Sequence, residues 1–224
     1  METGHRTNSP GGICTEDTTM TVPYNTIQLG DIACYEPSNW VGMAIVKLTG
    51  GRCCHVGIII ELGHRPHIHH AARGWFWHQS YISEPLDLGG THSACYKIVR
   101  LKYGQLFDVS KIESNLHKVL YRSLWLIGEK VPYDWIMITH EGARFILPFG
   151  IGQKLTHRSP LLAGGERRTM CSEAVSGHIW NPAWMEGYRG ASLSLFAQDP
   201  LQLPVWDTPR EIAESKNVVT IWER

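Results

Sequence analysis

Cys171 is the residue of this sequence best placed to act as a nucleophile. It opens a segment whose residues recur at helical spacing on one predicted face, namely Cys171, Ala174, Val175, His178 and Ile179. A thiol at the start of a helix lies near backbone N–H groups that stabilise its thiolate, and the same groups can stabilise an oxyanion. The alternative is a small buried apolar residue on an amphipathic helix. The local sequence leaves both interpretations open.

A nucleophilic cysteine needs a base, and His55 is the best-placed candidate. His55 begins an apolar run, where an imidazole without a polar partner would be costly to bury. A third polar group should orient that imidazole, and the return arm of the predicted hairpin offers His67, His69 and His70. Because side chains alternate along a strand, His67 and His69 share one face and His70 lies on the other. The uncertain length of the turn leaves open which face meets His55.

The same region contains enough cysteine and histidine to suggest a metal site instead. The candidate ligands are Cys53, Cys54, His55, His67, His69 and His70. The pair His67-x-His69 is similar to the start of a β-barrel metal motif, but no carboxylate follows between residues 71 and 75. No HExxH motif or zinc-finger spacing is present. We therefore expect no metal or cofactor, and a non-enzymatic metal-binding protein stays as an alternative.

The first half of the sequence predicts mostly strands. Residues 1–25 are polar and read as a flexible arm. A strand follows at 30–35, and Ser38 or Asn39 caps a short helix over 40–48 that stops at Gly50. The runs 54–61 and 66–71 predict a hairpin, and 94–101 predicts a further strand.

The second half predicts helices around a long loop. Ser110 and Glu113 fit a capping box for a helix that ends at Gly128. Residues from about 139 to 169 have no period and predict a loop, which also carries several basic side chains. A second capping box begins at Thr208, and 218–222 predicts a closing strand. Together these elements predict an α+β fold, an antiparallel sheet packed against helices, in one catalytic domain over 26–224.

The composition argues against several classes of protein. The 224 residues suit one domain, and 21 basic residues balance 21 acidic ones, which argues against a nucleic-acid partner. Six cysteines without a CxxC pair are too few for a disulfide scaffold, so a reducing compartment is expected. The sequence shows no signal-peptide run and no apolar stretch of membrane-spanning length. We predict a cytoplasmic protein without stable membrane insertion.

The order of short motifs resembles one enzyme family. These motifs are Gly30-Asp31-Ile32, Cys54-His55-Val56-Gly57-Ile58, Ile68-His69-His70-Ala71, Pro132-Tyr133-Asp134 and Met170-Cys171-Ser172-Glu173. Their order is similar to that of the circularly permuted NlpC-type papain-like cysteine hydrolases, in particular the YiiX-like group, over about residues 27 to 222. The resemblance implies a permuted papain-like fold with Cys171 as nucleophile and His55 as base. The third residue, most often Glu in that group, would be His69, with His70 the next choice.

The resemblance implies cleavage of an amide bond, in a peptide, an isopeptide or a cell-wall peptide, through an acyl-enzyme on Cys171. The first alternative is a lipid or N-acyl hydrolase or acyltransferase, because the related lecithin:retinol acyltransferase-like enzymes share the order of His before Cys. Trp75, Phe76 and Trp77 would wall a peptide cleft, whereas the apolar run 145–149 would form a lid over an acyl chain. The expected partner is therefore a peptide or acyl substrate.

Overall fold

The computed structural model describes residues 24–61, 66–71, 81–88, 95–131, 170–190, 194–196 and 207–224. Most of the predicted N-terminal arm and the whole of the predicted loop at 139–169 lie outside these residues. The aromatic run 75–77 and the apolar run 145–149 lie outside them as well.

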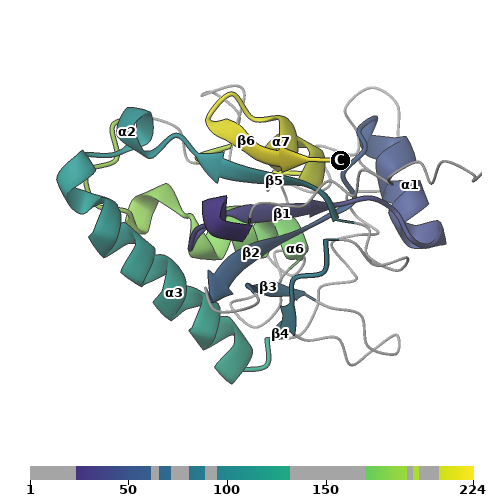
Figure 1. Ribbon diagram of the computed structural model, residues 1–224, viewed down its shortest axis with the longest axis horizontal. Helices are drawn as coiled ribbons and strands as arrows, with labels where there is room; N and C mark the ends of the chain where they lie inside the picture. Colours follow the sequence, from purple (N-terminus) through teal and green to yellow (C-terminus); the bar gives the residue numbers. More distant parts are fainter. Residues whose placement is uncertain are drawn as a thin grey trace, which may run out of the picture.

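The described strands form one antiparallel sheet in the order β4-β3-β2-β1-β5-β6 (Figure 1). Strands β1 and β2 lie in the middle, and β3 and β4 extend the sheet on the side of the predicted histidine hairpin. Their bounds are β1 (Ile32–Tyr35), β2 (His55–Glu61), β3 (His67–Ala71), β4 (Tyr81–Pro85), β5 (Cys95–Leu101) and β6 (Val218–Glu223).

The longest described helix is α3 (Ile112–Gly128), and shorter ones surround it. The α-helices are α1 (Trp40–Thr49), α2 (Tyr103–Leu106), α6 (Cys171–Glu173) and α7 (Pro209–Glu214). The π-helical turn η4 (Ala174–Ile179) continues α6, and the 3-10 turns are η1 (Tyr24–Thr26), η2 (Val109–Lys111) and η5 (Pro182–Trp184). Among the described helices, none has the length and apolar character needed to cross a membrane.

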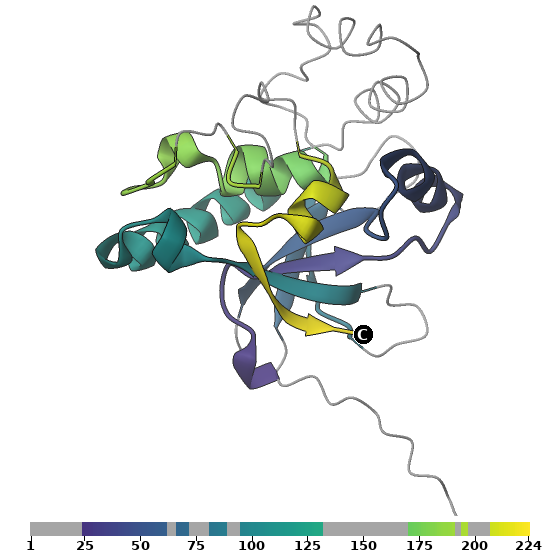
Figure 2. The ribbon, with the colours of Figure 1, turned by 90° about the horizontal axis from the view of Figure 1, so that it is seen from above.

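The helices α3, α6, α7 and η4 cover one face of the sheet (Figure 2). The larger apolar cluster fills the space between them and includes Val56, Ile58 and Trp180. A second, smaller cluster lies on the opposite face and includes Ile59 and Ile68. We call these two sides the helix face and the open face of the sheet.

The pleat of β2 separates its residues between the two faces. Val56 and Ile58 belong to the cluster on the helix face, whereas the intervening Gly57 lies against Ile68 on the open face. His55 has the same parity as Gly57, so its side chain also points to the open face. This alternation determines which candidate site residues can meet.

Most predicted elements are confirmed. The strands at 30–35, 54–61, 66–71, 94–101 and 218–222 are present within one or two residues of their predicted bounds. Asn39 caps α1 by accepting a hydrogen bond from the Gly42 N–H at 3.0 Å, and Gly50 ends it in the left-handed region. The capping box of Thr208 and Glu211 is also present. The α+β class and the antiparallel sheet are therefore confirmed.

Two local predictions are wrong. Ser110 does not cap α3, because its amide and hydroxyl both donate to Asp108, at 3.0 and 2.9 Å, and this Asp caps the 3-10 turn η2 instead. The helix that begins at Cys171 is α-helical for only three residues and then widens into a π-helical turn. As a result His178 is partly exposed and does not share a buried face with Cys171.

A buried ion pair ties the start of the sheet together. Asp31 is fully buried and accepts hydrogen bonds from two guanidinium nitrogens of Arg100, at 2.7 and 2.8 Å, and from the Gln28 N–H at 2.8 Å. Burial raises the pKa of Asp31, while Arg100 and Gln28 act in the opposite direction. Arg100 also donates to the carbonyl of Thr26, which holds η1 against β5.

Removal of one partner of this pair should destabilise the fold strongly. In Arg100→Ala the buried Asp31 carboxylate loses its cation, so we expect the free energy of unfolding to fall by about 3–5 kcal/mol. Chemical denaturation measures this change. Glu214→Gln, which breaks only the exposed pair with Arg210, is the matched control and should cost about 0.5 kcal/mol or less. Equal stability of the two variants would contradict the role given to Asp31.

Candidate active site

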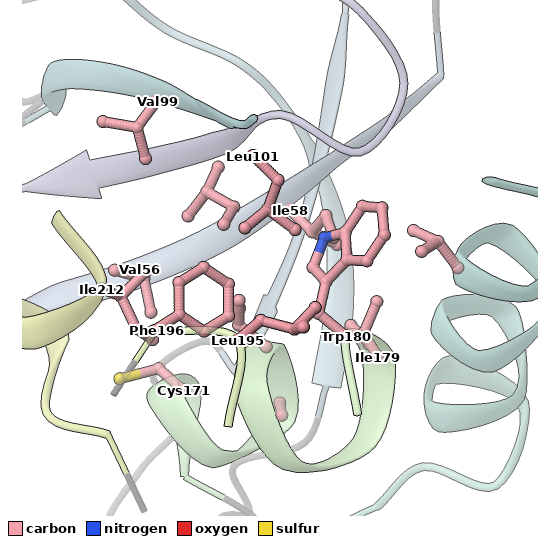
Figure 3. Packing of buried hydrophobic residues seen from close by; sticks show 14 of the residues in the cluster. Val56, Ile58, Val99, Leu101, Cys171, Ile179, Trp180, Leu195, Phe196 and Ile212 are labelled. Carbon is pink, nitrogen blue, oxygen red and sulfur yellow. The ribbon is translucent and has the colours of Figure 1, made fainter. Parts of the chain in front are cut away.

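Cys171 lies at the start of α6, against the middle of the sheet. It is 4% exposed and packs in the same apolar cluster as Val56, Phe196 and Ile212, which Figure 3 shows on one side of it. Met170, the residue before it, has an extended backbone, so Cys171 is the first residue with helical geometry. The first N–H groups of a helix have no acceptor within the helix, so they can stabilise negative charge that develops nearby.

The turn that carries Cys171 is held by hydrogen bonds among its own residues. The Met170 N–H donates to the carboxylate of Glu173 at 3.2 Å, and the Ala174 N–H donates to the Met170 carbonyl at 2.8 Å. Glu173 is buried, and its second carboxylate oxygen lies 3.7 Å from Nε2 of His178. The position of the Cys171 backbone is therefore fixed from both sides.

On the open face, three side chains form a hydrogen-bonded chain. Nε2 of His55 lies 2.8 Å from Nδ1 of His70, and Nε2 of His70 lies 3.3 Å from a carboxylate oxygen of Glu84. The ring of Tyr35 stacks on His70 at 6.2 Å between centroids and also touches His55. We call Glu84, His70 and His55 the relay, because a proton can pass between neighbouring members.

The imidazoles of the relay are held neutral. Burial, helped by the neighbouring His70, lowers the pKa of His55 to about 3. Burial also lowers the pKa of His70, although the nearby Glu84 carboxylate opposes this shift. A neutral His55 that donates its Nε2 hydrogen to His70 keeps Nδ1 as an acceptor, but a pKa of about 3 makes this nitrogen a weak base at neutral pH.

His69 lies on the helix face and makes a different set of contacts. It is 4% exposed, and its Nδ1 lies 2.7 Å from the hydroxyl of Ser123 on α3. The Tyr81 hydroxyl donates to the His69 carbonyl at 3.0 Å and lies within hydrogen-bond reach of Ser123. Burial, with the neighbouring His67 and His70, lowers the pKa of His69 to about 4. These contacts join the sheet to α3.

The structure thus divides the four predicted site residues into two pairs. His55 and His70 meet on the open face, whereas Cys171 and His69 belong to the helix face. The structure pairs His55 with His70, which was the second choice after His69, and the identity of a third catalytic residue stays a prediction. The physical reason is the register: Ile58 pairs with His69, and the diagonal from His55 on the same face reaches His70.

The residue before His55 in the chain, Cys54, interacts electrostatically with Cys171, as does Tyr81 on β4. Burial, with the charges of Cys53 and Cys171, raises the pKa of Cys54 to about 12, so its thiol stays protonated. Within the described ranges, no three His, Cys, Asp or Glu side chains converge in a way that would hold a metal ion.

Sequence reasoning missed β4 and, with it, Glu84 and Tyr81. The run Tyr81-Ile82-Ser83-Glu84-Pro85 has two β-forming residues followed by polar ones and a terminating proline, which is a weak strand pattern. Ser123 was missed because a serine within a helical pattern carries no signal of its own. Only the pairing of β3 with β4 places Glu84 beside His70.

No protein-family model matches this chain, and no curated protein matches it significantly. The geometry of the described residues therefore carries the functional argument.

Gly57 allows the two strands of the relay to approach closely, and a side chain there should disrupt it. A Cβ at this position would lie 2.8 Å from Cβ of His70 and 2.7 Å from Cγ1 of Ile68. In Gly57→Ala we expect a loss of about 1–3 kcal/mol in unfolding free energy and altered imidazole ¹⁵N shifts of His55 and His70. Gly104→Ala, where nothing lies within 4 Å, is the control and should be neutral or slightly stabilising. If the two variants behaved alike, the close approach would not matter.

The buried imidazoles also predict a pH dependence of stability. Because the pKa of His69 is lowered to about 4 in the folded state, the unfolded chain binds more protons as the pH falls below about 6.5. Stability should therefore be highest above pH 6.5 and fall towards pH 4, by up to about 1.4 kcal/mol per pH unit for this group. His69→Asn can keep the bond to Ser123 without titrating and should flatten the profile. Asp207, whose pKa burial raises to about 6, acts in the opposite direction in both proteins and cancels in the difference. Parallel profiles would refute a neutral His69.

Proposed function

We propose that the protein is a cysteine hydrolase that cleaves an amide bond through an acyl-enzyme formed on Cys171. The reaction would begin with transfer of the thiol proton to His55 and attack of the thiolate on the carbonyl. His70 would orient His55, and Glu84 would orient His70 and stabilise positive charge on it. The N–H groups at the start of α6 would stabilise the oxyanion, and the protonated His55 would return its proton to the leaving amine. This proposal includes the permuted papain-like fold that the motif order implies.

The observation that carries the proposal is the relay itself. A carboxylate, an imidazole and a second imidazole are linked in series, and the chain ends at the first residue of β2. Glu84 is 52% exposed in its side chain, so the chain connects the half-buried His55 to solvent. His69 is bonded to a serine hydroxyl, which stabilises an imidazolium less than a carboxylate does.

The positions of the two groups set a condition on the mechanism. Cys171 and His55 lie on opposite faces of β2, and the route between them passes the start of this strand, at Cys54. The proposal therefore requires that the thiol or the imidazole turn towards this end of the strand when substrate binds. Catalytic hydrogen bonds often tighten only in the complex with substrate.

A second candidate is the transfer or hydrolysis of a lipid or N-acyl group. Cys171 packs in an apolar cluster that includes Val56, Phe196 and Ile212. Such surroundings suit the chain of a fatty acyl thioester better than a polar peptide backbone. Comparison of p-nitroanilides of short peptides with p-nitrophenyl esters of acetate and octanoate separates the two candidates: a preference for the octanoyl ester favours acyl chemistry.

Replacement of the nucleophile and of the competing bases tests the proposed function. With p-nitrophenyl acetate, the wild-type protein should form an acetyl group on Cys171, detectable by mass spectrometry, and Cys171→Ala should lose both the acetyl group and the turnover. His55→Gln should slow acylation by about 100-fold or more, since it removes the base. His69→Asn should change the rate by less than about threefold, provided that it folds.

The controls distinguish the possible assignments. Cys54→Ala removes the neighbouring thiol and should leave the label on Cys171. A large loss in His69→Asn with normal acylation in His55→Gln would make the relay structural and assign the base to the helix face. Turnover that survives Cys171→Ala would refute the cysteine hydrolase.

A further inference from the structure

A pocket separate from Cys171 lies between α3 and η5. Its volume is about 430 Å³, within the range of about 300–1,000 Å³ of typical small-molecule sites. Its wall consists of Ser114, His117, Lys118, Tyr121, Arg122, Trp184 and Met185. None of these residues belongs to the relay or to the surroundings of Cys171.

The wall formed by residues 184–186 is fixed before any ligand arrives. Buried Asn115 bonds both backbone groups of Glu186: its amide donates to the carbonyl at 3.0 Å, and its oxygen accepts from the N–H at 2.8 Å. Lys118 donates to the Trp184 carbonyl at 3.0 Å. A ligand would therefore enter a preformed site, which lowers the entropy cost of binding.

The charge of the pocket is positive. Lys118 and Arg122 line it and no acidic residue does. The nearby Glu186 already pairs with Lys118 at 2.8 Å and Lys111 at 3.5 Å. Arg122 has no carboxylate partner among the described residues. Its guanidinium lies 3.2 Å from the centre of the Trp184 ring, so one of its planar faces is covered while its N–H edges can bind an anion.

Besides Ser114 and His117, the rest of the pocket wall is apolar or aromatic. Tyr121 is 66% exposed, so its ring is open to a ligand. Trp184 is also exposed, and Met185, which is buried, lines the pocket with it. An aromatic ring can stack on these flat side chains while an attached anion reaches Arg122.

We propose that this pocket binds a small anion that carries an aromatic ring, with the anionic group on Arg122 and the ring against Tyr121 and Trp184. The ligand therefore needs both an anionic group and an aromatic ring. An anion without a ring would make no contact with Tyr121 and Trp184, and a neutral ring would leave Arg122 without an anionic partner.

Calorimetric titration with phenyl phosphate tests the proposal. Inorganic phosphate and phenol serve as the anion-only and ring-only probes, and both should bind at least about tenfold more weakly than phenyl phosphate. Arg122→Gln should weaken phenyl phosphate binding by about tenfold or more, because a charge-assisted hydrogen bond is lost. Tyr121→Ala should weaken it while leaving the weak affinity for inorganic phosphate unchanged.

Two controls keep this result apart from the proposed enzymatic function. Lys47→Gln on α1 removes an exposed cation far from the pocket in sequence and should bind phenyl phosphate normally. Cys171→Ala should also bind it normally, whether or not the protein is a hydrolase. Equal affinity of wild type and Arg122→Gln would overturn the proposal, as would inorganic phosphate that binds as tightly as phenyl phosphate.

Discussion

The two-residue repeat of strand β2 is the constraint on which the arrangement of the candidate site depends. Val56 and Ile58 point into the core under the helices, so His55 and Gly57 must point to the other side. If the strand pairing slipped by one residue, Val56 and Ile58 would leave the core and turn to the open face. The loss of their burial would cost much free energy. The apolar core thus fixes the side of the sheet on which each imidazole lies, and Cys171 is held on the other side with Val56.

This division gives each face its own polar network. On the helix face, His69 and Ser123 satisfy one another deep in the core, where an unpaired polar group would be costly. On the open face, the relay runs from the half-exposed Glu84 to the half-buried His55. Protons can therefore exchange with solvent through Glu84, whereas His69 is sealed between the sheet and α3. His69 and His70 are adjacent residues of β3, yet only the relay, which contains His70, suits repeated proton transfer.

The sequence predicted the strands and helices better than it predicted which side chains meet. Strong local patterns, such as the run that begins at His55 and the capping box at Thr208, specify strands and helices without help from the rest of the chain. The choice between His69 and His70 depends on the pairing of β2 with β3, which the turn between them decides and the sequence pattern does not. Glu84 lies on a strand with a weak pattern, so its role in the relay emerges only from strand pairing.

The candidate active site and the pocket beside α3 share one chain segment, and its middle is clamped. Cys171 begins this segment, Trp184 lies near its end, and between them Trp180 is fully buried. The Trp180 indole packs against the rings of Phe107 and Tyr103, at 6.2 and 5.7 Å between centroids. A displacement at Trp184 would have to move this large buried side chain before it reached Cys171, and close-packed cores resist such movement. Occupation of the pocket should therefore leave the geometry at Cys171 unchanged, so the two sites would act independently unless ligand binding first displaced Trp180.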